Sequence, residues 1–181
     1  MRKVILNVAV SLDGYIEGPA GEYDWCLADQ DYGMAAFFED TDAIFIGRKS
    51  YELIRAEHIT YPDKKIYVFS DTMQAELDAG IEVIPSTDLY KTVTRIREQP
   101  GKSIWLFGGA SLVSAFINKN MVSELQLSVH PILLGGGKPL FENMKDQTRL
   151  ELLEQTVYDT GLVQLRYSVN PKFDMDLLKM L

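Results

Sequence analysis

Five short apolar runs recur along the first two-thirds of the chain, and they limit its fold more than any other feature. Each run is almost continuously apolar and rich in β-branched residues, which is typical of strands buried on both faces of a sheet. The runs occupy residues 4–10, 43–46, 66–69, 82–84 and 104–107. Segments with helical signals lie between or after them, at 31–39, 48–54, 89–96 and 112–117. This order predicts an α/β fold in which helices cover both faces of a mainly parallel sheet.

The last third of the chain changes to a two-residue alternation of apolar and polar side chains. The alternation runs over residues 125–130 and again over 163–169. Such a pattern predicts strands with one solvated face. The residues Asp-Thr-Gly at 159–161 predict a hairpin turn between strands at 150–157 and 162–169.

Together these signals predict one domain with about eight strands. The expected architecture has three layers, with a central mixed, mainly parallel sheet between helices, and a length of 181 residues fits a single domain of this kind. We assign residues 1–170 to the domain and 171–181 to a tail. Met175, Leu178 and Leu181 predict a short amphipathic helix in that tail.

Composition excludes several classes of protein. A net charge of -8 argues against a general nucleic-acid binder, which needs a basic face for phosphates. The single cysteine, Cys26, excludes a disulfide framework and a zinc site with several thiolate ligands, and we predict no metal site. No apolar run approaches the ~18 residues of a membrane span, and the N-terminal run is too short for a signal peptide. We therefore expect a cytoplasmic protein without nucleic-acid or membrane partners.

The acidic residues are concentrated near the N-terminus. Between Asp13 and Asp42 there are nine acidic side chains and no Lys or Arg. Such a stretch is typical of a solvated surface, and the alternative is that some of its carboxylates line a binding site. The charge pattern leaves both interpretations open.

Three turns follow the carboxyl ends of buried strands, which is where open α/β sheets bind ligands. They are Gly47-Arg48-Lys49-Ser50, Phe69-Ser70-Asp71 and Phe107-Gly108-Gly109-Ala110-Ser111. Glycine lets the backbone approach a ligand, and the start of a helix offers free N–H groups to phosphate. Gly108-Gly109 opens a clear helix and is the strongest of these signals, although a tight turn without a ligand explains it equally well.

Arg48 and Lys49 are a basic pair within the acidic half of the chain. Two cations at the start of a helix oppose the helix dipole, so helix stability does not explain them. An anionic ligand does, and the 2′-phosphate of an NADP-type cofactor fits an arginine at such a turn. The alternative is a pair of solvated surface charges.

A second glycine-rich run covers residues 130–141. No helix start follows it, so we interpret it as a backbone excursion at a sheet edge or subunit interface and not as a phosphate loop. His130, at its start, is interpreted as structural, and His58 as an exposed loop residue. The glycines at 135–137 and the apolar tail favour a homodimer through an edge contact.

Five motifs occur in one order along the chain. They are Val8-Ala9-Val10-Ser11-Leu12-Asp13-Gly14-Tyr15-Ile16, Ile46-Gly47-Arg48-Lys49-Ser50-Tyr51-Glu52, Tyr67-Val68-Phe69-Ser70, Phe107-Gly108-Gly109, and the run from Pro131 to Phe141. This order resembles the dihydrofolate reductase superfamily over residues 3–169. It is most similar to stand-alone relatives of the reductase domain, the C-terminal domain, of bifunctional riboflavin biosynthesis proteins.

The resemblance implies a central eight-stranded mixed sheet and the cofactor NADPH. The residues implied at the adenosine-side phosphates are Gly47, Arg48, Lys49 and Ser50. Those implied near the adenine ribose are Phe69, Ser70 and Asp71, and those at the pyrophosphate are Gly108, Gly109, Ala110, Ser111 and Leu112. The resemblance places Val10, Ile16 and Phe107 beside the nicotinamide. It also places Asp13 and Gly14 at a mobile loop over the reaction centre.

The chain also departs from the folate reductases, which carry a pterin-binding carboxylate on the first helix. Asp24, Asp29 and Asp31 are candidates for that carboxylate here, ahead of Glu39 and Asp40. Trp25 resembles the tryptophan that precedes the helix. The deaminase half of the bifunctional proteins is absent, in agreement with the single cysteine.

The leading hypothesis is an NADPH-dependent reductase that transfers hydride to a small heterocyclic substrate, pterin- or pyrimidine-like, or to a carbonyl. Asp13 is the first candidate for substrate contact or proton relay, and Trp25 and Tyr51 are candidates for shaping the substrate pocket. Turn chemistry for Asp13 and core packing for the two aromatic residues are the alternatives. The competing functions are a dihydrofolate reductase proper and a nucleotide-binding protein of this fold without turnover.

Overall fold

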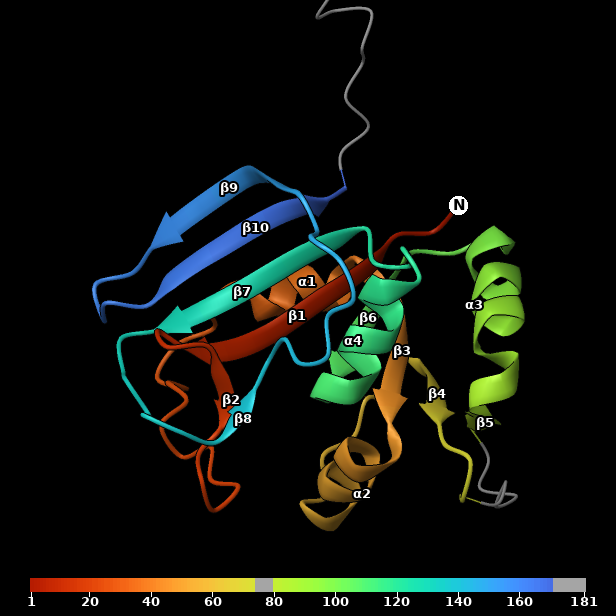
Figure 1. Cartoon of the computed structure of the whole chain (residues 1–181), viewed down its shortest axis with the longest axis horizontal. Helices are drawn as coiled ribbons and strands as arrows, with labels where there is room; N and C mark the ends of the chain where they lie inside the picture. The colour runs from red at the N-terminus through yellow and green to blue at the C-terminus, as the bar shows by residue number, and fades with distance from the viewer. Residues whose placement is uncertain (74–79, 171–181) are drawn as a thin grey trace, which may run out of the picture.

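The computed structural model describes residues 1–73 and 80–170, and its centre is an eight-stranded sheet in the order β5-β4-β3-β6-β1-β7-β10-β9 (Figure 1). Its strands are β1 (Val4–Ser11), β3 (Thr41–Gly47), β4 (Lys65–Phe69), β5 (Ile81–Ile84), β6 (Ser103–Gly108), β7 (Glu124–His130), β9 (Leu150–Val157) and β10 (Val163–Val169). The six strands from β5 to β7 are parallel, and only the β7–β10 and β10–β9 pairs are antiparallel. The predicted mixed, mainly parallel α/β sheet is therefore confirmed.

Two apolar cores form because successive residues of a strand point to opposite faces of the sheet. The helices are α1 (Met34–Glu39), α2 (Arg48–Ala56), α3 (Leu89–Glu98) and α4 (Ala110–Asn118). Leu6 and Phe45 pack with α3 and α4 on one face, whereas Ile5 and Ile44 pack with α1 and α2 on the other. Figure 1 shows α4 in front of the sheet and α1 behind it. The fold thus has the three layers that the sequence predicts.

Helix α1 begins three residues later than the predicted helix at 31–39. Tyr32 and Gly33 have φ values of 49° and 77°, and this left-handed pair interrupts the backbone before Met34. Residues 24–33 are therefore an irregular segment, which leaves their side chains free to line a groove. In the described part of the chain, no helix has the length and apolarity needed to cross a bilayer.

The glycine-rich run leads into β8 (Lys138–Pro139), which pairs with β2 (Tyr15–Glu17) in a separate two-stranded sheet. Its interpretation as a contact at a sheet edge or subunit interface stays a prediction. Strands of two and three residues are too short to leave a periodic signal in a sequence. The helix predicted at 171–181 lies outside the described residues.

Candidate active site

The three glycine- and serine-containing turns border a single groove of about 600 Å³. They follow β6, β3 and β4, which are neighbours in the sheet, so their carboxyl ends lie next to one another. The groove is lined by Glu17, Gly47, Arg48, Lys49, Ser50, Phe69, Ser70, Asp71, Thr72, Ser86, Leu89, Gly109, Ala110, Ser111, Leu112, Ala115 and Lys138. We call this the cofactor groove. It brings together eleven of the residues that the resemblance assigns to NADPH, from all three turns.

Two helices begin at the cofactor groove. Helix α2 starts after Gly47 and α4 after Gly109, and no side chain caps either N-terminus. The two turns touch, because a Cβ placed on Gly47 would lie 3.6 Å from the carbonyl oxygen of Gly108. The first-turn N–H groups of both helices therefore border one space, and their positive ends suit an anion there. This set of donors fits the pyrophosphate of a dinucleotide.

Charged side chains of both signs surround those helix starts. The Arg48 guanidinium donates two hydrogen bonds to the carboxylate of Glu52, at 2.8 and 2.9 Å. Lys49 is exposed and has no ion-pair partner in the described ranges. The Asp71 carboxylate accepts a hydrogen bond from the backbone N–H of Ser86 at 2.7 Å, which lowers the pKa of Asp71. The groove therefore offers cations to phosphate but also holds a fixed carboxylate.

A second groove, of about 490 Å³, lies on the α1 side of the sheet. Its walls come from β1, β6, β7 and the irregular segment before α1. They are formed by Asn7, Val8, Ala9, Cys26, Leu27, Ala28, Gln30, Asp31, Tyr32, Met34, Trp105, Phe107, Ser128, His130 and Leu162. We call this the substrate groove, because it combines apolar and aromatic walls with a few polar groups, as small-molecule sites do.

The two grooves lie on either side of the carboxyl end of β6. Phe107 lines the substrate groove, and Gly109, two residues later, lines the cofactor groove. The peptide bond between Gly108 and Gly109 is cis, and Gly108 has a φ of 123°, which favours glycine.

Asp31 lines the substrate groove, unlike Asp24 and Asp29. One Asp31 carboxylate oxygen accepts a hydrogen bond from the backbone N–H of Ala35 at 2.9 Å, which fixes the side chain at the start of α1. Asp29 instead accepts a hydrogen bond from the Tyr32 hydroxyl at 2.6 Å. Geometry therefore singles out one of the carboxylates that the sequence left open.

His130 also lines the substrate groove, although the sequence suggests only a structural role. Its ring is buried, and Nδ1 lies 2.9 Å from the carbonyl oxygen of Ser128. Because a carbonyl oxygen can only accept, Nδ1 is the donor in this contact. Within the described residues, Nε2 is buried without a hydrogen-bond partner. Trp25 packs edge-on against this ring, with centroids 5.3 Å apart, and so shapes the groove through His130.

Cys26 lines the same groove but is a poor nucleophile. Burial, followed by the nearby carboxylate of Asp24, raises the pKa of its thiol to about 11. The thiol is therefore protonated at neutral pH, and the thiolate that nucleophilic catalysis requires is scarce.

Asp13 lies outside the walls of both grooves. Its carboxylate accepts hydrogen bonds from the Ser11 hydroxyl at 2.6 Å and from the backbone N–H groups of Leu134 and Gly135 at 3.1 and 2.8 Å. The bond from Ser11, together with those from the backbone, lowers the pKa of Asp13. Asp13 thus joins the turn after β1 to the glycine-rich run, which is the structural alternative to its catalytic assignment.

Three other predicted site residues belong to the apolar cores. Val10 is buried with the α3 and α4 side chains, and Ile16 packs against that cluster. Tyr51, on α2, is buried in the core on the other face, together with Ile54 and Trp105. The walls of the two grooves include none of these three side chains. Their assignment to the site stays a prediction from the resemblance.

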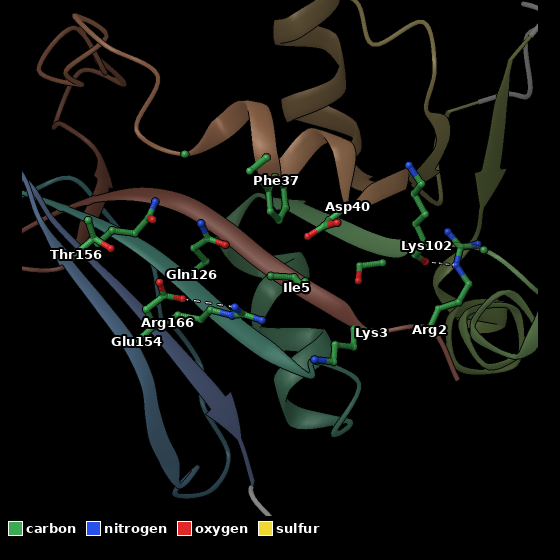
Figure 2. Close-up of a pocket in the computed structure, with 15 residues that line it drawn as sticks. Arg2, Lys3, Ile5, Phe37, Asp40, Lys102, Gln126, Glu154, Thr156 and Arg166 are labelled. Carbon is green, nitrogen blue, oxygen red and sulfur yellow. Dashed lines mark hydrogen bonds and ion pairs between the residues drawn. The ribbon is translucent and has the colours of Figure 1, made fainter.

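A third cavity, of about 590 Å³, lies on the α1 face near the start of β1 (Figure 2). It is rich in charge, and several of its charged groups bind one another or the backbone. Arg166 lies 3.6 Å from Glu154, and Arg2 Nε donates to the carbonyl oxygen of Lys102 at 2.6 Å. Asp40, one of the two less favoured candidates for a pterin-binding carboxylate, lines this cavity, but none of the residues assigned to the cofactor does. We therefore place the active site in the other two grooves.

Two cations of that cavity hold a buried carboxylate, which predicts an acid-sensitive contact. Burial by itself would raise the pKa of Glu124, but hydrogen bonds from Lys3 at 2.5 Å and Arg166 at 2.8 Å outweigh it and lower the pKa. The contact therefore stabilises the fold above the ordinary value of 4.5 and is lost as pH falls through the lower folded value.

We expect the Glu124→Gln variant to show this loss. Urea titrations of both proteins should give a difference in the free energy of unfolding that shrinks by about 1 kcal/mol between pH 7 and pH 3. A constant difference over that range would contradict the assigned role of Glu124.

Comparison with known proteins agrees with this arrangement. The family model of the RibD C-terminal domain matches residues 2–164. The uncharacterized protein YyaP of Bacillus subtilis (strain 168) is 41% identical over 183 residues, which cover 93% of this chain and 96% of YyaP.

Among solved structures, a putative riboflavin biosynthesis protein from Shewanella sp. PV-4 has a TM-score of 0.79 at 24% identity and covers 94% of this chain and 100% of its own. A dihydrofolate reductase from Enterococcus faecalis, complexed with NADP(H), has a TM-score of 0.66 at 18% identity and covers 93% and 97%. These two likenesses show a dihydrofolate reductase-like fold. From the family match and the identity to YyaP, the chain belongs to the RibD C-terminal domain family.

Proposed function

We propose that this protein is an NADPH-dependent reductase of a small heterocycle, with a pyrimidine-type ring as the first candidate. The observation that carries the proposal is that the two grooves flank the end of β6, with Phe107 lining one and Gly109 the other. A dinucleotide on the three turns would direct its reactive end toward the substrate groove at this point. Membership of the RibD C-terminal domain family supports reductase chemistry on a pyrimidine-type substrate.

Each groove has a distinct part in this proposal. When bound, the cofactor supplies a hydride from its nicotinamide. The N-termini of α2 and α4 bind its phosphates, and the turn after β6 directs its reactive end toward the substrate groove. Trp105 and Phe107 give that groove aromatic walls for a planar ring. The Asp31 carboxyl group orients the substrate and passes a proton to it.

Binding and turnover test this function separately. Titration with NADPH should quench the fluorescence of Trp105, which lines the substrate groove, and raise the melting temperature. A panel of pyrimidine, pterin and carbonyl substrates should then consume NADPH with the pyrimidine class. Turnover of dihydrofolate alone would assign a folate reductase, and binding without any turnover would assign a nucleotide-binding protein. Absence of any NADPH effect would contradict the cofactor groove.

The Arg48→Ala variant tests the assignment of the basic turn. Arg48 offers a planar fork of donors that suits a phosphate. We expect its loss to weaken NADPH roughly tenfold more than NADH, measured by calorimetric titration. Arg95→Ala is the control, because Arg95 pairs with Glu82 on the surface and lies outside the cofactor groove. Equal losses of affinity for NADPH and NADH would contradict the assignment of Arg48 to the 2′-phosphate.

Two further expectations stay predictions from the sequence, namely a cytoplasmic location and a homodimer. Leu133, within the glycine-rich run that favours an edge contact, is exposed. The edge strand β9 exposes Leu152, Leu153 and Val157. Sedimentation of the purified protein would decide its oligomeric state.

A further inference from the structure

The order of the strands gives the cofactor groove two distinct ends. From the substrate groove, the groove passes the carboxyl end of β6, then that of β3, and reaches that of β4. If the protein binds a dinucleotide as proposed above, its reactive end lies beside Phe107. Its phosphates then lie at the starts of α4 and α2, and its adenosine end lies beside β4. The residues around β4 therefore face the adenosine ribose, where NADPH and NADH differ.

A carboxylate is fixed at that end of the groove. Asp71 is exposed, and it follows β4 directly. The hydrogen bond from the Ser86 backbone N–H, at 2.7 Å, ties it to the segment that follows β5. Because both segments line the groove, the charge of Asp71 is held at the groove wall.

Arg48, the arginine in the wall of the cofactor groove, is already paired. Both oxygens of Glu52 accept hydrogen bonds from Arg48, one helical turn away on α2. A phosphate at the ribose would have to draw the guanidinium from Glu52 or share it. Arg48 would therefore stabilise a 2′-phosphate less than an unpaired arginine does.

We propose that Asp71 is a specificity-determining residue that disfavours the 2′-phosphate of NADPH relative to the 2′-hydroxyl of NADH. The physical reason is the difference between the two groups. A hydroxyl donates a hydrogen bond to a carboxylate, whereas a phosphate carries negative charge and repels it. Glu52 acts on the same choice by holding Arg48. The protein thus uses NADH more readily than the basic turn alone suggests.

The Asp71→Asn variant isolates the charge, because asparagine keeps the oxygen that accepts the Ser86 N–H. Calorimetric titration with each dinucleotide gives the NADPH-to-NADH affinity ratio without relying on turnover. We expect the variant to raise that ratio about fivefold at low salt and less at high salt. Adenosine 2′,5′-bisphosphate and AMP should show the same change, since they differ only at the 2′ position.

Two variants serve as comparisons. Asp63→Asn removes the same charge in the turn before β4, at the opposite end of that strand and outside the cofactor groove, and should leave the ratio unchanged. Glu52→Gln should raise the ratio in the same direction as Asp71→Asn, because it releases Arg48.

The outcomes separate this inference from the proposed function. If wild-type protein binds both dinucleotides and Asp71→Asn leaves their ratio within about twofold, the role of Asp71 is overturned while the cofactor site stands. An equal shift in Asp63→Asn would also overturn it, because net charge would then explain the effect. Binding of neither dinucleotide would overturn both proposals together.

Discussion

The Asp31→Asn variant is expected to lower kcat/KM about a hundredfold, the usual range for loss of a proton-transferring group. Asp31 lines the substrate groove, and its carboxylate is fixed by the backbone N–H of Ala35. Asparagine keeps an oxygen that can accept the hydrogen bond from the Ala35 N–H, so the fold and the NADPH affinity should not change. The measurement is steady-state kinetics with the pyrimidine-type substrate that supports turnover.

Asp29→Asn is the matched control for this prediction. Asp29 lies two residues away and binds the Tyr32 hydroxyl, and asparagine can keep that contact. Its effect on kcat/KM should be small. Equal losses in both variants would mean that the segment before α1 tolerates no change of charge, and Asp31 would lose its assigned role.

The Gly137→Ala variant is expected to destabilise the protein by about 3 kcal/mol, because it combines backbone strain with a steric clash. Gly137 has a φ of 124°, and a Cβ placed there would lie 2.0 Å from the carbonyl oxygen of Glu17. That atom belongs to the backbone of the β2 strand and cannot swing aside. Urea unfolding should show the loss, and NADPH affinity should fall too, because Glu17 and Lys138 line the cofactor groove.

Gly135→Ala separates strain from contact in the same run. Gly135 also has a positive φ, 70°, but its Cβ would meet no atom within 4 Å. Only the backbone cost remains, so the loss should be about 1 kcal/mol. Equal free energies of unfolding for the two variants would contradict the close packing of the glycine-rich run on β2.

The parts of the site that could be predicted from sequence are those determined by neighbouring residues. A buried strand that ends in glycine and continues as a helix leaves a local signal, and the turns at Gly47 and Gly109 both do so. That two such turns share a groove follows from the parallel sheet, because its strand ends meet at one edge. Local signals and strand order thus identify the turns, whereas their residue-by-residue assignment to NADPH came from the family resemblance.

The substrate groove was harder to predict because its walls come from segments far apart in the chain. Asp31 could not be separated from Asp29, since only the left-handed backbone at Tyr32 and Gly33 decides which carboxylate reaches the groove. His130 gave no motif, and only the three-dimensional structure shows that its Nε2 has no hydrogen-bond partner among the described residues. Tyr51 could not be assigned from the sequence either, because an aromatic residue near a glycine turn suits a pocket and a core equally.

The carboxyl end of β6 lies between two compartments whose walls come from different parts of the chain. The sequence of one set of walls can therefore change while the other set stays the same. The segment from Cys26 to Met34 borders only the substrate compartment, whereas the starts of α2 and α4 border only the other. Replacing that one segment could therefore exchange the molecule to be reduced while the source of reducing equivalents stays the same.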